Sequence, residues 1–196
     1  SRTGGVSETY VIGIKDQNAA TTPSPASPTD AKTASFFSYF EEGVSHLFGG
    51  PDHLLFLLVL IIPTVYAGRS LKTVAIAALL PITGFTLGHA LTLAAGASGL
   101  IRPPAQIVEI LIAVTILLTA IDNVKRFIPG PRSVIAFAFG LIHGFGFASA
   151  LGALSVTGWQ MATALLGFNL GIEAGQAVLA LAVAPLLLLV RDPAKH

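Results

Sequence analysis

HLFGGPDHLLFLLVLII, residues 46–62, joins a polar start to an apolar end. Its first eight residues contain His46, Asp52 and His53, whereas its last nine contain no polar side chain. Proline favours the first position of a helix, so Pro51 predicts a helix that carries this aspartate and histidine in its first turn. The Gly-Gly-Pro sequence predicts a break at which the chain turns as it enters the membrane.

The composition of the chain indicates a membrane protein. Of its 196 residues, 53% are hydrophobic and 11% are charged, against about 25% charged residues in a typical soluble domain. Several stretches reach the roughly 20 apolar residues that a spanning helix needs. The net charge of +1 gives no reason to expect nucleic acid as a partner, so membrane lipid is the expected surrounding. Because cysteine is absent, disulfides are excluded and a metal site must use nitrogen and oxygen ligands.

These patterns predict an all-α membrane protein in two parts. Residues 1–35 form a polar, largely disordered segment rich in Ser, Thr, Pro and Gly, and residues 36–196 form the transmembrane domain. An amphipathic segment over 36–48, lying at the interface or entering the membrane, precedes a bundle of about five transmembrane helices. The predicted spans are 51–67, 73–96, 104–123, 133–156 and 160–190. The last is long for one span, so it tilts, protrudes or breaks near Gly171 or Gly175.

The distribution of basic residues predicts the orientation. Lysine and arginine follow every second span, as Arg69 and Lys72, then Lys125, Arg126 and Arg132, then Arg191 and Lys195. The other two loops contain only Arg102. The chain starts at Ser1 without a methionine, which leads us to expect a removed signal peptide and a periplasmic N-terminus. Basic loops favour the cytoplasmic side, so both observations predict a protein of the bacterial inner membrane with a cytoplasmic C-terminus.

Ionisable residues gather at one predicted depth. Charged groups inside a bilayer are costly and usually functional. The residues in question are Asp52, His53, His89, Glu109, His143 and Glu173, with His46 at the edge. The orientation assigns them to the outer half or the middle of the membrane, where lysine and arginine are absent. A divalent cation would neutralise the carboxylates, and imidazole with carboxylate suits nickel, cobalt, zinc, iron or copper(II).

Helical spacing adds polar neighbours to this layer. Thr86 and His89 share one helix face with Thr83, and Asn169 and Gln176 share another with Glu173. We expect Thr86, Asn169 and Gln176 to orient metal ligands.

Five of these ionisable residues also have a simpler explanation. Asp52 could only favour a helix start, and His46 could face water at the interface. His143 could hydrogen-bond a neighbouring helix, and Glu109 and Glu173 could be protonated packing residues.

Several motifs resemble the HupE/UreJ family of bacterial membrane proteins. Its signature of a histidine, five residues and Asp-His matches His46, LFGGP and Asp52-His53. Further segments over about 36–190 resemble its second branch, namely GGPDHLLFLL, TGFTLGHALTL, VEILIAV, GLIHGFGFA and FNLGIEAGQ. The resemblance implies permeation of nickel, or of cobalt, for hydrogenase or urease maturation, with the signature residues binding metal. The first branch also carries paired histidines followed by a glutamate, whereas here His143 stands alone with Phe145 and Phe147 nearby.

Three functions remain open from the sequence. The first is a permease that takes a divalent metal from the outer side. The second is an intramembrane metal-dependent hydrolase in which Glu109 or Glu173 is the general base; the small number of spans and the lack of an inverted repeat favour it. The third is an accessory subunit of a larger membrane assembly, or a homo-oligomer, that holds a structural metal. The inner halves of the predicted spans are almost purely apolar, so the sequence reveals no path through them.

Overall fold

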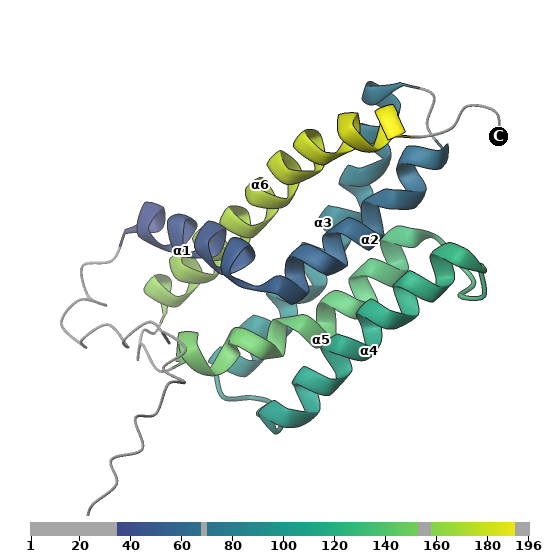
Figure 1. Cartoon of the computed structure of the whole chain (residues 1–196). Coiled ribbons are helices and arrows are strands. Elements are labelled where there is room, and N and C mark those ends of the chain that lie inside the picture. The colour runs from purple at the N-terminus through teal and green to yellow at the C-terminus, as the bar shows by residue number, and fades with distance from the viewer. Residues whose placement is uncertain (1–34, 68–69, 153–157, 191–196) are drawn as a thin grey trace, which may run out of the picture.

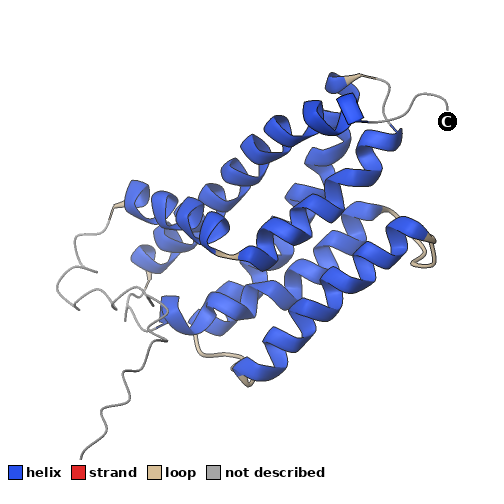
Figure 2. Cartoon of the chain, viewed as in Figure 1, coloured by secondary structure: helices blue, strands red, loops and turns tan. Residues whose placement is uncertain are grey.

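The computed structural model describes residues 35–67, 70–152 and 158–190, and in these ranges the chain is helical without strands (Figures 1 and 2). The helices are α1 (Phe36–Gly49), α2 (Pro51–Ala67), α3 (Leu71–Ala97), α4 (Ala105–Val124), α5 (Arg132–Gly152) and α6 (Trp159–Val190). The all-α prediction is therefore confirmed. The prediction of a disordered N-terminal segment concerns residues outside the described ranges.

Three of the helices, α3, α4 and α6, are each long and apolar enough to cross a membrane. The 17-residue α2 reaches that length only together with α1, from which it is bent by 78°. The apolar part of α5, Arg132–Ala148, is shorter, and its predicted end at residue 156 lies outside the described ranges. The described helices thus give three or four candidate spans, so five spans remain a prediction. The long α6 runs as one helix through Gly171 and Gly175.

The break between α1 and α2 lies at the predicted Gly-Gly-Pro sequence. The backbone N–H of Gly50 donates to the carbonyl of His46 at 3.0 Å and ends α1, and Pro51 begins α2. The amphipathic α1 packs closely along α6, since a Cβ at Gly43 would collide with the carbonyl oxygen of Phe168. Helix α1 therefore enters the bundle and carries His46 with it.

Glycines allow an equally close approach of α3 and α5. A Cβ at Gly88 would collide with the carbonyl oxygen of Phe137, and one at Gly144 with that of His89. The contacts advance in the same direction along both helices, so α3 and α5 run parallel. Small residues permit such contact between helices in a membrane. Because of this packing, His89 and His143 lie at the same level of the bundle.

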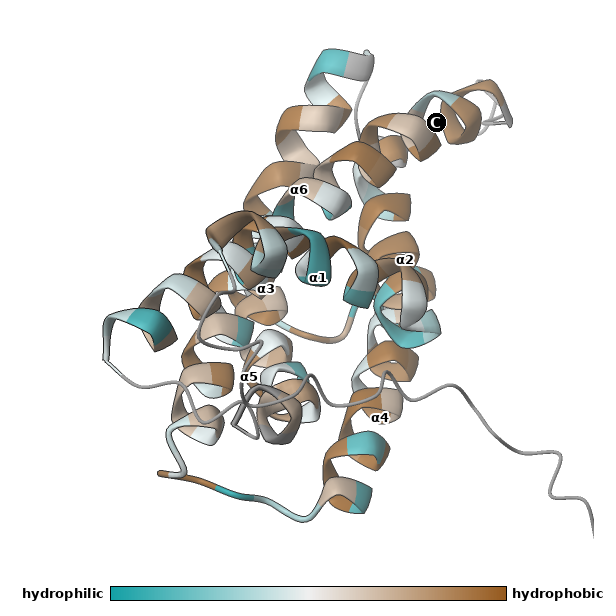
Figure 3. Ribbon diagram, turned by 90° about the vertical axis from the view of Figure 1, so that its left-hand side faces the viewer, coloured by the Kyte–Doolittle hydropathy of each residue, from teal (hydrophilic) through white to brown (hydrophobic). Residues whose placement is uncertain are grey.

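The outer surface of the bundle is apolar. Large side chains such as Leu80, Leu117 and Leu186 are more than half exposed. Most of the helical ribbon in Figure 3 is brown, the colour of hydrophobic residues. A soluble protein rarely exposes so large an apolar surface, whereas a helix in lipid must. The described surface therefore fits contact with membrane lipid.

Polar side chains secure the turn between α4 and α5. Oδ1 of the buried Asp122 accepts the backbone N–H groups of Phe127 and Ile128 at 2.9 and 2.8 Å, and Oδ2 lies 3.7 Å from Arg132. Arg132 also donates to Asn123 at 3.0 Å. We call Asp122, Asn123 and Arg132 the turn network, and each has a partner for its polar groups.

Asn123 also satisfies a carbonyl in α2. Pro63 lies inside α2 and has no N–H to donate to the carbonyl of Val59, four residues earlier. The amide of Asn123 donates to that carbonyl at 2.5 Å. The turn network thus extends to α2 and offsets the hydrogen bond that Pro63 removes.

Candidate metal centre

Four helices bring their predicted ligands together in one cluster. We call His46 from α1, Asp52 and His53 from α2, His89 from α3 and His143 from α5 the histidine cluster. The ring of His53 is central, with centroids 4.8 Å from His46, 5.6 Å from His143 and 6.1 Å from His89. Residues separated by almost 100 positions in the sequence therefore meet at the bend between α1 and α2.

The side chains of the cluster form two groups that could each hold a metal ion. One group is His46, His53 and His89, and the other is Asp52, His53 and His143. Within each group one ligand atom per residue can be chosen so that all lie within 4.8 Å of one another. His53 belongs to both groups.

Five ring nitrogens of the cluster are buried and have no hydrogen-bond partner among the described residues. In the described part of the chain, no hydrogen-bond partner reaches Nε2 of His46, either nitrogen of His53, Nε2 of His89 or Nδ1 of His143. His53, His89 and His143 are exposed by only 4, 0 and 1%. Oδ1 of Asp52 lies 3.5 Å from Nδ1 of His53, too far for a good hydrogen bond. A buried polar atom without a partner costs about 1–3 kcal/mol, so such a set needs an explanation.

The partner of His89 fixes which ring nitrogen is free for a metal. Nδ1 of His89 lies 3.1 Å from Oδ1 of Asn169, whose amide nitrogen donates to the carbonyl of Leu165 at 2.7 Å. Since Oδ1 of Asn169 can only accept, Nδ1 of His89 carries the hydrogen. The unpaired Nε2 therefore holds the lone pair that a metal needs.

Thr115 fixes His143 in the same way. Its hydroxyl donates to the carbonyl of Ile112 at 2.7 Å, so its oxygen accepts from Nε2 of His143 at 3.0 Å. Nδ1 of His143, the unpaired atom, then carries the lone pair. Sequence reasoning missed Thr115, although it is a polar residue in the buried stripe of α4 formed by Val108, Ile112, Thr115, Thr119 and Asp122.

Phenylalanine rings enclose the cluster. The ring of Phe147 lies 4.5 Å from His46 and stacks on Phe168 at 4.7 Å, and that of Phe85 lies 5.1 Å from His143. The ring of Phe56 lies 5.2 Å from that of His143 and 4.8 Å from that of Phe85. Phe147 therefore packs directly against a predicted ligand.

Two polar contacts between α3 and α6 lie next to the cluster along these helices. The hydroxyl of Thr83 donates to Oε1 of Glu173 at 2.6 Å, and that of Thr86 lies 3.2 Å from Oε1 of Gln176. With His89 and Asn169 they form three successive polar contacts along α3. Glu173 is thus held by Thr83 and belongs to neither ligand group, whereas the predicted partners Thr86, Asn169 and Gln176 all make contacts between these helices.

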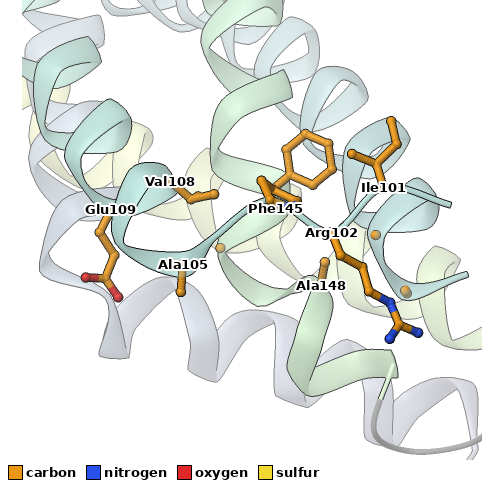
Figure 4. A pocket seen from close by; sticks show the side chains of 11 residues that line it. Ile101, Arg102, Ala105, Val108, Glu109, Phe145 and Ala148 are labelled. Carbon is orange, nitrogen blue, oxygen red and sulfur yellow. The ribbon is translucent and has the colours of Figure 1, made fainter. Parts of the chain in front are cut away.

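Glu109 lies in a different place from the cluster. It is exposed and lines a pocket of about 380 Å³ between the end of α3, the start of α4 and α5. Arg102 lines the same pocket, and Figure 4 shows the two side chains at its opposite ends. The sequence argument grouped Glu109 with the histidines by its predicted depth in the membrane. Depth carries no information on the direction in which a side chain points, so the grouping was wrong in space.

The chain matches the family described as HupE / UreJ protein over residues 24–196. No curated protein and no solved structure matches the chain. The matched range begins before residue 36, where the resemblance seen in the sequence began, and it includes every residue of the histidine cluster. Because the match covers most of its length, the chain belongs to the HupE/UreJ family.

Proposed function

We propose that this protein binds a divalent transition-metal cation in the histidine cluster and conducts it across the membrane, with nickel as the preferred ion and cobalt next. The observation that carries the proposal is that hydrogen bonds fix the tautomers of His89 and His143. Asn169 and Thr115 each occupy one nitrogen of a buried histidine and leave the other as an acceptor facing the cluster. Ligating histidines are generally held by such a second hydrogen bond.

The donor set agrees with the proposed ions. Four imidazoles and one carboxylate offer nitrogen and oxygen atoms, which suit nickel, cobalt, zinc, iron and copper(II), whereas magnesium and calcium prefer oxygen. Family membership favours nickel and cobalt within this group. The carboxylate of Asp52 is about one-third exposed and can meet a hydrated cation before the buried imidazoles do.

The proposed direction is from the outer side toward the cytoplasm. The basic residues that follow alternate spans support a cytoplasmic C-terminus. In this orientation the contacts Thr86–Gln176 and Thr83–Glu173 lie on the inner side of His89 and continue the polar route. A phosphatase that is active only in the periplasm should be inactive when fused after His196, and a fluorescent protein fused at the same position should fold and fluoresce in the cytoplasm. The reverse result would contradict the orientation.

The two other functions make different demands on the glutamates. A hydrolase would need Glu109 or Glu173 beside the metal as a general base, whereas Glu109 is exposed in a separate pocket and Glu173 is hydrogen-bonded to Thr83. A structural metal would bind without net movement across the membrane. Transport is therefore the property that separates the proposal from both alternatives.

The test is metal uptake into liposomes that contain the purified protein and an enclosed metal-sensitive dye. We expect entry of Ni²⁺ and Co²⁺ with wild-type protein and little entry of Mg²⁺. The His53→Ala variant is the matched control, because it removes the residue common to both ligand groups. Metal binding without uptake would favour the accessory subunit, and absence of binding would refute the proposed function.

A further inference from the structure

The two ligand groups of the histidine cluster differ in charge and exposure but share one residue. Asp52, His53 and His143 include a carboxylate whose side chain is 35% exposed. His46, His53 and His89 are all imidazoles, and His89 is fully buried. The first group is therefore accessible from outside the protein through Asp52. In the second group, His89 is hydrogen-bonded to Asn169 of α6, the helix that also carries Glu173 and Gln176.

The shared residue limits how the groups can be used. A neutral imidazole has one nitrogen with a lone pair, so His53 can ligate one ion at a time. Both ring nitrogens of His53 are buried without a hydrogen-bond partner in the described chain, and Oδ1 of Asp52 lies 3.5 Å from its Nδ1, so no strong hydrogen bond holds His53 to either group. In contrast, Asn169 and Thr115 hold His89 and His143 in one tautomer each.

We propose that the cluster provides two successive positions for one metal ion and that His53 transfers the ion between them. The ion first binds Asp52, His53 and His143, and it then exchanges Asp52 and His143 for His46 and His89 while His53 remains a ligand. The exchange keeps an imidazole on the ion throughout, so the ion never loses all its protein ligands in a low-dielectric site. This inference rests on the proposed function and adds the order of binding.

The experiment uses Co²⁺ as a probe, because its visible absorption bands depend on the number and type of its ligands. Purified protein in detergent is titrated with Co²⁺ for wild type, His46→Ala, His143→Ala, the double variant and His53→Ala. His196→Ala, which changes a histidine outside the described ranges, is the control for the loss of one imidazole. The thermal midpoint of each metal-free variant is measured to verify folding.

We expect one Co²⁺ per chain in wild type, because the positions share His53. His46→Ala and His143→Ala should each retain one ion with less than about 10-fold loss of affinity, and their spectra should differ because only the first keeps the carboxylate group. The double variant and His53→Ala should lose affinity by more than about 100-fold, beyond the losses seen when residues that only orient ligands are changed.

Other outcomes would refute either the transfer model or the proposed function. If His46→Ala or His143→Ala alone abolishes binding in a folded protein, the ligands form a single site and the transfer model fails while the proposed function stands. Identical spectra of these two variants, or two ions per wild-type chain, would also refute the sharing of His53. If wild type binds neither Co²⁺ nor Ni²⁺, the proposed function itself fails.

Discussion

The histidine cluster and the turn network are both buried and polar, yet they differ in how their polar atoms are satisfied. In the turn network, Asp122 accepts two backbone N–H groups, and Arg132 and Asn123 are bonded to each other. In the histidine cluster, five buried ring nitrogens have no hydrogen-bond partner among the described residues. The turn network is complete within the protein, whereas the cluster needs an additional ligand.

This difference separates stability from binding. A satisfied buried network contributes to folding, and the loss of one member leaves its partners unpaired. Unpaired nitrogens cost free energy in the metal-free protein and are useful only when something binds them. Substitutions in the turn network should therefore lower stability and leave metal affinity almost unchanged. Substitutions in the histidine cluster should lower metal affinity without lowering the stability of the metal-free protein.

The largest effect on metal content is expected from His53→Leu. The change removes the buried ligand that both groups share, so affinity for Ni²⁺ should fall by at least about 100-fold. The thermal midpoint without metal should be equal to or higher than that of wild type, because an apolar side chain replaces an unpaired nitrogen. Calorimetric titration and thermal unfolding in detergent measure both quantities; a large loss of metal-free stability would contradict the comparison.

The largest effect on stability is expected from Asp122→Ala. Two backbone N–H groups and Arg132 lose their partner, which should lower the free energy of unfolding by about 3 kcal/mol. Metal affinity should stay within about twofold of wild type in the folded protein, because the network lies apart from the cluster. Asp122→Asn is the matched control: it keeps an acceptor oxygen and should lose less stability. Equal losses in the two variants would show that the acceptor role is unimportant.

A smaller effect on affinity is expected from Thr115→Val. The variant keeps the shape of the side chain but removes the acceptor that holds the hydrogen on Nε2 of His143. In an otherwise wild-type chain the affinity should fall by less than about 10-fold, because His46, His53 and His89 remain a complete group. In the His46→Ala background it should fall by about 10–100-fold, the usual effect of removing a residue that orients a ligand. Thr115→Ser retains the hydroxyl and should have little effect in either background. No effect of the valine substitution in the His46→Ala background would remove the tautomer argument for His143.

The smallest effect is expected at the bend between α1 and α2. A Cβ at Gly50 would lie 3.0 Å from both Oδ1 of Asp52 and Nδ1 of His53, so Gly50→Ala should displace both and weaken binding by about 10-fold. At Gly49 a Cβ meets nothing within 4 Å, which makes Gly49→Ala the control for the loss of a glycine. Equal affinities of the two variants would show that the position of Asp52 and His53 is not critical.

The sequence predicted much of the fold because its signals are local. Long apolar runs predicted the helices, and Gly49, Gly50 and Pro51 predicted the break that ends α1. The number of membrane spans is harder to predict, since α1 and α2 can count as one bent span. Hydropathy alone measures the length of apolar stretches and contains no information on such bends.

Predicting the whole site required information on contacts between distant residues, which local sequence patterns lack. The motif around His46, Asp52 and His53 is visible in the sequence because its members are neighbours. The contacts His89–Asn169 and His143–Thr115 join residues 80 and 28 positions apart, so the tautomers could not be read from spacing. Thr115 was missed because threonine in a membrane helix commonly bonds its own backbone, which it also does here.

The glycine contacts join four helices in two close pairs, and the histidine cluster lies between the pairs. Helix α1 approaches α6 closely at Gly43 and Gly171, and α3 approaches α5 closely at Gly88 and Gly144. His89 and His143 belong to one pair and His46 to the other, so a movement of one pair against the other would change the distance from His46 to His89 while that from His89 to His143 stayed constant. Such a movement would also alter the hydrogen bond from His89 to Asn169, which joins the two pairs. The glycines that let the helices touch therefore also determine which ligand distances can vary.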